Sequence, residues 1–273
     1  MSKVAIIIPC YNHGAYIREA LESLRDLSSL EVEVVIVNDG STDKQTLDEL
    51  NQLKHEGFRV IDQKNQGLGK TRNNGIKATQ APYILPLDSD NRINPNYVRR
   101  AVEILEKQPE IGVVYSNPRY FGEREGIGEL PDFNLQRLML GNYIDACAVY
   151  RRSAWEEVGG YDENMPFMGV EDWEFWLHLA FKGYGFHHIP EPLYDYRVAP
   201  VSMIKKDTAP NFQVLKAYIE QKHNRFLDYN FVGTYVSERF KAAPLAFLVK
   251  LILRTWFPSR YTKLVQERKL NRI

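Results

Sequence analysis

Three aspartates of this sequence follow mostly apolar segments, in positions where carboxylates can bind a cation or a phosphate-bearing ligand. Asp39 follows the segment 32–37, and Asp88 and Asp90 follow the segment 83–87. In an open α/β sheet the ligand crevice lies beyond the carboxyl ends of the strands, so we expect the three carboxylates to converge there. Three close carboxylates repel one another, and a divalent cation offsets that repulsion; oxygen ligands favour Mg²⁺ or Mn²⁺ over zinc. The alternative is that each aspartate caps a helix or forms a turn.

The segments that must position these acids alternate between strand and helix periods. The sequence predicts strands at 4–8, 32–37, 58–61, 83–87 and 112–115, and helices at 16–27, 46–55, 71–79 and 97–107. This alternation is typical of an α/β fold with a mainly parallel central sheet flanked by helices on both faces.

The second half of the chain has a less regular pattern. It predicts a loop at 120–132, a strand at 146–150, a helix at 153–158, a helix at 171–183, a short strand at 186–189, and helical structure after residue 207. The glycines and prolines between 120 and 132 are the reason for expecting a loop there.

Composition excludes several classes of protein. The chain has 273 residues, 44% of them hydrophobic, and equal numbers of basic and acidic residues, 35 of each. That balance argues against a nucleic-acid-binding protein. Two cysteines without a metal-binding spacing favour a reducing compartment, and the apolar segment 4–9 is too short for a signal peptide. The sequence contains no run of 18 uncharged apolar residues, so it predicts no membrane-spanning helix. We expect a cytoplasmic location.

Two nucleotide-binding motifs are absent. Gly69-Lys70-Thr71 resembles the end of a P-loop, but Lys64 stands where the motif requires its first glycine. The first strand-to-helix turn lacks the glycine pattern of a dinucleotide-binding fold.

Six segments, in order and with consistent spacing, resemble the family 2 glycosyltransferases of the GT-A fold. They are residues 8–24, 34–43, 65–76, 85–95, 158–163 and 169–184. The resemblance covers roughly residues 3–203 and implies an α/β GT-A fold. It also implies a bacterial, non-processive enzyme, because the QxxRW motif of processive relatives is missing.

The resemblance assigns a nucleotide-binding set. Pro9 and Tyr11 match positions that pack against the base and sugar of the nucleotide, and Asp39 matches the acid that meets the uridine. Arg72 matches a basic residue near the base and phosphates.

Asp88-Ser89-Asp90 matches the DxD motif of this family. The resemblance implies that Asp88 meets the ribose and that Asp90 holds the divalent metal, Mn²⁺ or Mg²⁺, on the diphosphate. The chain departs from the family at Asn91, where many relatives carry an acid, and at Ala199, where relatives often carry a histidine that joins the metal. The second departure leaves open whether metal binding is weaker or completed by water.

Asp172 matches the catalytic base of the inverting members of the family. Glu171 and Trp173 would then line the acceptor side. A helix N-terminus lowers the pKa of an acid and a neighbouring carboxylate raises it, and the sequence does not decide between these effects at Asp172. Alternatively, the two acids are ordinary N-terminal charges of a helix, and Trp173 and Trp176 belong to a buried stripe.

The C-terminal segment carries a charge of its own. Residues 239–273 hold nine basic residues and one acid, a net charge of +8, while the preceding residues carry −8. Within it, residues 242–257 are mostly apolar, broken by Lys250 and Arg254. Such a helix suits the plane of an anionic membrane surface, and the alternatives are packing on the catalytic domain or a homodimer contact.

The leading hypothesis is an inverting, metal-dependent glycosyltransferase in cell-surface polysaccharide synthesis, peripheral on the inner face of the membrane. It would use a nucleotide-sugar donor, a UDP-sugar first, and a glycan or lipid-linked acceptor. We expect a catalytic domain at 1–205, with a nucleotide-binding half at about 1–117 and an acceptor half at about 118–205. A helical extension follows at 206–273, basic and amphipathic from about 239. The alternatives are a sugar nucleotidyltransferase and a non-catalytic glycan-binding protein of the same fold.

Overall fold

The computed structural model describes residues 3–27, 30–200, 203–223, 233, 236–237, 240–257, 260–261 and 264. Contacts divide the chain into two compact units, Met1–His223 and Asn224–Ile273. Much of the basic tail, namely residues 239, 258–259, 262–263 and 265–273, lies outside the described residues. None of the helices in the described part combines the length and the apolar character that crossing a bilayer requires.

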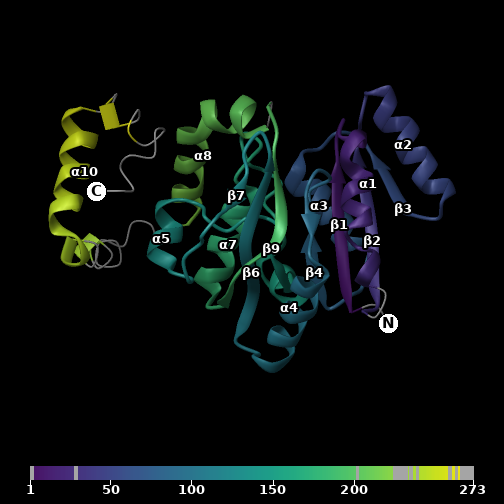
Figure 1. Ribbon diagram of the computed structural model, residues 1–273, viewed down its shortest axis with the longest axis horizontal. Coiled ribbons are helices and arrows are strands. Elements are labelled where there is room, and N and C mark those ends of the chain that lie inside the picture. Colours follow the sequence, from purple (N-terminus) through teal and green to yellow (C-terminus); the bar gives the residue numbers. More distant parts are fainter. Residues whose placement is uncertain are drawn as a thin grey trace. The chain divides into compact units, whose positions relative to one another are not determined.

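Within the described residues, nine strands form one sheet flanked by helices (Figure 1). The strands are β1 Val4–Cys10, β2 Val32–Asp39, β3 Arg59–Gln63, β4 Tyr83–Pro86, β5 Arg92–Ile93, β6 Ile111–Gly122, β7 Gly126–Ile127, β8 Val149–Arg151 and β9 Gly185–Val198. Their order is β3-β2-β1-β4-β8-β6-β9-β5, and β7 pairs with β6. The pairs β3–β2, β2–β1, β1–β4 and β6–β9 are parallel, whereas β8 and β5 run antiparallel to their neighbours. The expected mainly parallel α/β sheet is confirmed.

The helices in the described residues follow the strands along the chain. They are α1 Gly14–Glu22, α2 Lys44–His55, α3 Leu68–Lys77, α4 Pro95–Lys107, α5 Leu135–Leu140, α6 Arg152–Val158, α7 Glu171–Lys182, α8 Ala209–Lys222 and α10 Pro244–Trp256, with a 3₁₀ turn at Arg25–Leu27 and a π-helical turn at Ile204–Thr208. Local sequence explains the starts of two of them. The Asp43 carboxylate accepts a hydrogen bond from the amide of Thr46, 2.8 Å away, and Asn94 with Pro95 begins α4 in the same way.

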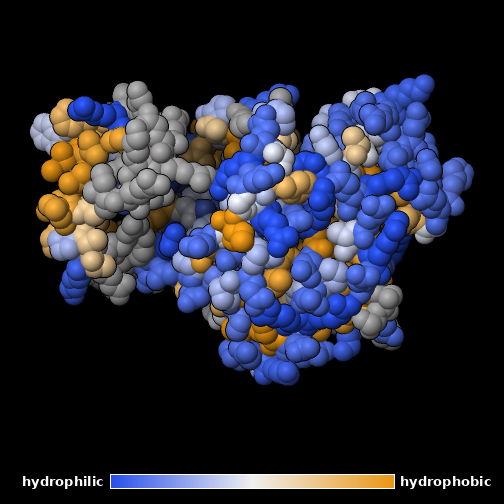
Figure 2. All heavy atoms as spheres, viewed as in Figure 1, coloured by the Kyte–Doolittle hydropathy of each residue, from blue (hydrophilic) through white to orange (hydrophobic). Residues whose placement is uncertain are grey.

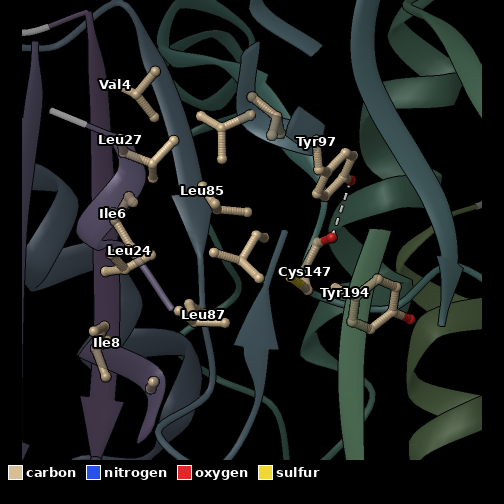
Figure 3. Close-up of a cluster of buried hydrophobic side chains, with 14 of the residues drawn as sticks. Val4, Ile6, Ile8, Leu24, Leu27, Leu85, Leu87, Tyr97, Cys147 and Tyr194 are labelled. Atoms are coloured by element: carbon tan, nitrogen blue, oxygen red, sulfur yellow. Dashed lines mark hydrogen bonds between the residues drawn. The ribbon is translucent and has the colours of Figure 1, made fainter. Parts of the chain in front are cut away.

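The core lies on both faces of the sheet because β1 is buried along its whole length. On one face Val4, Ile6 and Ile8 pack in a single hydrophobic cluster with residues of β4, α1 and α4 (Figure 3). On the other face α3 approaches β1 very closely at Gly75. A Cβ there would lie 2.4 Å from Ile7, so only glycine permits this packing.

The middle of the chain differs from the sequence prediction. The expected loop at 120–132 is confirmed only in part, because β6 continues to Gly122 and β7 at Gly126–Ile127 returns alongside it. The short strand expected at 186–189 is likewise part of the 14-residue β9, which pairs with β6 along its length. Register shifts near Ile111, Ser116 and Asn117 interrupt the two-residue alternation. Prolines within both strands also weaken the local signal, so the periodicity does not reveal the ladder.

Helix α8 packs on α7 within the first compact unit. Its Phe212 ring stacks on Trp173 at a centroid distance of 6.0 Å. At its end, Lys222 forms an ion pair of 2.8 Å with the fully buried Glu174, which also bonds His223 at 2.8 Å. Because a buried carboxylate is costly without partners, this pairing ties the two helices together.

Candidate active site

The parallel strands bring three polar chain segments to one edge of the sheet. Strand β1 ends at Cys10, β2 ends at Asp39, and β4 ends two residues before Asp88, and their paired registers place these ends together. Pro9 is buried within β1, whereas Tyr11 is 46% exposed just beyond it. The polar segments that follow β1, β2 and β4 therefore lie at the same edge of the sheet, where Tyr11 is exposed.

Asp39 is held by the segment that leads into α3. Its carboxylate accepts hydrogen bonds from the amides of Gln66 at 2.8 Å and Gly67 at 3.0 Å, and from the side chain of Gln63 at 2.7 Å. These bonds turn the carboxylate toward residues 63–67 and supply it with hydrogen-bond donors there.

Arg72 lies at the centre of the acidic part of the site. It is 2% exposed, and it donates a hydrogen bond of 2.9 Å to the Asp88 carboxylate. Burial opposes its charge, but the carboxylates of Asp88, Glu171 and Asp172 outweigh burial and raise the pKa of Arg72. Its Nε is buried and has no hydrogen-bond partner among the described residues.

The three aspartates expected to form one cluster do not make up a group that could hold a metal ion among the described residues. Asp88 and Asp90 influence each other, and burial followed by the charge of Asp88 raises the pKa of Asp90. Asp39 is instead occupied by its own loop. The described residues contain no group of three or more histidine, cysteine, aspartate or glutamate side chains arranged around a metal. The expectation of a three-carboxylate cluster is therefore wrong, because the loop amides satisfy Asp39.

The DxD segment is fixed by its neighbours. Ser89 and Asn91 are buried, and Asn91 accepts a hydrogen bond of 2.9 Å from the amide of Arg197 in β9. The Arg197 guanidinium in turn donates to the carbonyl of Asp90 at 3.1 Å. These bonds hold the Asp90 backbone, and its half-buried carboxylate is an oxygen donor of the kind that Mg²⁺ and Mn²⁺ prefer.

The N-terminus of α7 carries the two acids expected at the reaction centre. Val170, directly before it, has a left-handed backbone with φ of 66°, a strained conformation for a β-branched residue. Glu171 is buried, and its carboxylate accepts a hydrogen bond of 2.8 Å from the amide of Gly169. A strained backbone of this kind persists only where the surrounding structure holds it in place. Such residues are common at functional sites.

Asp172 is a half-buried carboxylate with both oxygens engaged. Oδ1 accepts from the amide of Trp173 at 2.8 Å, and Oδ2 accepts from the side chain of Asn142 at 2.9 Å. Burial raises the pKa of Asp172 to about 6; Arg72 opposes this rise and Glu171 adds to it. The sequence did not decide in which direction the pKa of Asp172 shifts. It shifts upward, because burial outweighs the hydrogen bonds that stabilise the carboxylate.

Trp173 was expected on the acceptor side, and the structure corrects this. It is completely buried, with its indole nitrogen donating to the carbonyl of Leu138 at 2.6 Å. Trp176 is buried in the same way and donates to the carbonyl of Ile144 at 3.1 Å. Both tryptophans therefore belong to the core, as the buried-stripe alternative held, because α7 is covered on that side by other parts of the chain.

The sequence analysis missed two site residues, Asn142 and Asp145. Burial, followed by the charge of Asp88, raises the pKa of Asp145 to about 7, and Asp172 also adds to the rise. Both residues precede β8, which runs antiparallel to β4. The residues before β8 therefore lie at the carboxyl end of β4, beside the DxD segment. Only the strand pairing reveals this, since no local motif marks these residues.

Comparisons with known proteins identify the family of this chain. The family model described as Glycosyl transferase family 2 matches residues 5–159. EpsH of Bacillus subtilis (strain 168), named as a glycosyltransferase, is 29% identical over 253 residues, which cover 83% of this chain and 71% of that protein. Chondroitin synthase of Escherichia coli is 29% identical over 261 residues, 93% of this chain but only 36% of that protein.

Solved structures show the same fold. The S. aureus TarS 1-349 structure superposes with a TM-score of 0.60 at 24% identity, covering 71% of this chain and 60% of that one. TarS 1-349 in complex with UDP-GlcNAc gives a TM-score of 0.62 at 23% identity, with 74% and 60% covered. With the fold of a GT-A glycosyltransferase and a family model that covers more than half of its length, the chain belongs to glycosyl transferase family 2.

Proposed function

We propose that this protein is an inverting, metal-dependent glycosyltransferase that moves a sugar from a UDP-sugar to a hydroxyl group of a glycan or lipid-linked acceptor. The observation that carries the proposal is the position of Asp172. Its carboxylate and that of Asp88 both interact electrostatically with Arg72. A base with a pKa near 6 is ionised at neutral pH and still accepts a proton. The names of EpsH and chondroitin synthase support a role in polysaccharide synthesis.

The proposed reaction is a single displacement. Asp172 takes the proton of the acceptor hydroxyl, whose oxygen forms a bond to the anomeric carbon of the donor sugar. The bond between that carbon and the diphosphate oxygen breaks, and its electron pair leaves with UDP. Attack opposite to the leaving group inverts the anomeric configuration. Hydrogen-bonding distance to the acceptor and a pKa near the working pH are what such a base requires.

Other residues of the proposal bind the donor. Tyr11, beside Pro9, contacts the base, Asp39 meets the uridine, and Arg72 with Asp88 and Ser89 faces the sugar and phosphates. The UDP-GlcNAc complex of TarS supports a uridine nucleotide as the donor type. These residues lie within the proposed nucleotide-binding half at about 1–117, and Asp172 lies in the proposed acceptor half at about 118–205.

Asp90 is the residue that we propose to hold the divalent cation. The fit rests on its half-buried carboxylate, its hydrogen-bonded backbone and the neighbouring Asp88. A bound Mn²⁺ or Mg²⁺ would neutralise the negative charge that builds on the departing diphosphate. Ala199 stands where many relatives have a ligand histidine, so water would complete the coordination.

Binding of UDP together with Mn²⁺ is expected to raise the melting temperature by about 5 °C or more at a hundredfold excess over Kd. GDP and CDP, tested alongside, should give clearly smaller shifts. Differential scanning fluorimetry of the full chain with UDP, with UDP-sugars, and with each in the presence or absence of Mn²⁺ measures this. Asp90→Asn should lose the part of the shift that depends on Mn²⁺. Equal shifts with all nucleotides would contradict the proposed donor class, and UDP release that requires an acceptor would distinguish a transferase from a binding protein.

Helix α10 is the proposed contact with an anionic membrane surface. It exposes apolar residues along much of its length, and Figure 2 shows hydrophobic residues gathered over it. They are Leu245, Leu248, Leu251, Ile252 and Trp256, and the exposed Phe257 follows directly after the helix. The segment 239–273 carries a net charge of +8, which complements anionic headgroups. Two free, buried cysteines accord with a reducing compartment, and we propose the cytoplasmic face of the membrane.

Full-length protein is expected to sediment with vesicles of phosphatidylglycerol and phosphatidylcholine. Leu248→Glu with Ile252→Glu places two charges on one face of α10, so sedimentation should fall at least tenfold. Leu47→Glu, an exposed leucine of α2, is the matched control and should sediment like the wild type. Equal recovery of all three proteins in the soluble fraction would contradict the membrane contact.

A further inference from the structure

Among the described residues, the side chain of Asn142 reaches the carboxylate of Asp172 from another segment of the chain. Its Nδ2 donates to Oδ2 at 2.9 Å, while the other carboxylate oxygen, Oδ1, accepts from the neighbouring amide of Trp173. The amide of Asn142 has a defined orientation, because its Oδ1 accepts from the amide of Ile144 at 3.2 Å. The nitrogen therefore faces the carboxylate, and the contact is a hydrogen bond rather than a repulsion.

The segment that carries Asn142 is anchored on two sides. Ile144 is fully buried, and its carbonyl accepts from the indole of Trp176 in α7 at 3.1 Å. Three residues further on, the carbonyl of Cys147 accepts from the hydroxyl of Tyr97 in α4 at 3.1 Å (Figure 3). The backbone at Asn142 is thus tied to the same helix that carries Asp172, which fixes the distance between the two side chains.

We propose that Asn142 is a positioning residue that holds the Asp172 carboxylate in the orientation needed to accept a proton from the acceptor. The inference rests on the proposed role of Asp172 as the base. A carboxylate at a helix N-terminus can rotate about both of its side-chain bonds. The single hydrogen bond from the adjacent amide of Trp173 does not fix both side-chain torsions. The second bond, from Asn142, does so and leaves the remaining lone pairs for the acceptor hydroxyl.

The charged and titratable groups around Asp172 come from several elements. Arg72 of α3 lowers its pKa and Glu171 of α7 raises it. Asp172 in turn acts on Asp145, Tyr161 and Tyr196. Asn142 and the Trp173 amide stabilise the ionised form. Because the Asn142 bond is one of few contributions favouring the carboxylate, its loss should move the titration of Asp172 upward.

The test is a titration of Asp172 in the full chain, followed by ¹³C NMR of aspartate-labelled protein, with Asp172→Asn identifying its signal. Asn142→Ala should raise the apparent pKa of Asp172 by about one unit. Asn142→Asp, nearly isosteric but without the donor and with a like charge, should raise it further. Asn142→Gln keeps the amide and should restore most of the wild-type titration. Asn164→Ala, another exposed asparagine in the same half, should leave it unchanged.

UDP release from UDP-GlcNAc, measured on the same variants at pH 6 and pH 8, gives a second readout. Asn142→Ala should lose roughly fivefold at pH 6 from the shift in ionisation alone, and less at pH 8. An unmoved titration in Asn142→Ala, or equal losses at both pH values, would overturn the positioning role. If Asp172→Asn retains transfer, the base assignment fails and the positioning role fails with it, even where the titration moves.

Discussion

Replacing Asp172 with asparagine is expected to lower the rate of sugar transfer by roughly 10²–10⁴-fold while leaving the affinity for UDP within about twofold of the wild type. Asparagine matches the shape of the side chain but cannot take a proton from the acceptor hydroxyl. Its effect should fall on kcat, because the proposed nucleotide contacts at Tyr11, Asp39 and Asp88 are not changed. Single-turnover transfer and isothermal titration with UDP measure the two quantities separately.

Wild-type activity should also depend on the ionisation of Asp172. Its pKa is raised to about 6, so the carboxylate is mostly ionised at pH 7 and becomes protonated as the pH falls through 6. A base works only in its ionised form, and kcat/KM should therefore fall about tenfold per pH unit below that value. The control is Asp48→Asn, an exposed aspartate of α2, which should change neither rate nor pH profile. Near-normal turnover in Asp172→Asn would show that another group is the base.

Replacing Arg72 with methionine is expected to have the second large effect, on stability and on donor binding together. Arg72 is 2% exposed and is the cation beside Asp88, Glu171 and Asp172. Its loss leaves these carboxylates without compensation. Breaking a buried ion pair costs about 3–5 kcal/mol, and we expect about 2–3 kcal/mol here because Asp88 is 33% exposed and partly screened by water.

The same substitution should weaken UDP binding by at least about tenfold, because the phosphates would face unpaired carboxylates. Urea denaturation and isothermal titration measure the two effects. Arg25→Met removes a surface ion pair with Glu22 and should cost under about 1 kcal/mol, which makes it the matched control. Arg72→Lys keeps the charge and should recover part of the stability. An unchanged denaturation midpoint together with unchanged UDP affinity in Arg72→Met would contradict the central role of this arginine.

The two predictions separate the parts of the site. Asp172→Asn tests the proton transfer with donor binding intact, whereas Arg72→Met tests the electrostatic balance on which both acids depend. Because Arg72 lowers the pKa of Asp172, the acidic limb of any residual activity in Arg72→Met should shift above pH 6.

Some of the architecture follows from the sequence by itself. The uninterrupted apolar segment of β1 predicts a strand buried on both faces, and the alternation of strands and helices up to α4 predicts a parallel sheet. These features depend on neighbours only a few residues apart, so their periodicity is visible in the chain. The acids after β4 are marked by their place after a strand and by the family resemblance, and Asp172 at the start of α7 is marked by the resemblance.

Only the tertiary structure decided the remaining features. The Asp39 carboxylate binds the amides of residues 66 and 67, and Trp173 lies in the core. The antiparallel pairing of β8 with β4 brings Asn142 and Asp145 to the site. The long β6–β9 ladder joins residues 73 or more positions apart, such as Val114 and His187. Pairings of this kind arise from burial and hydrogen bonding across the whole fold, and local periodicity carries no record of them.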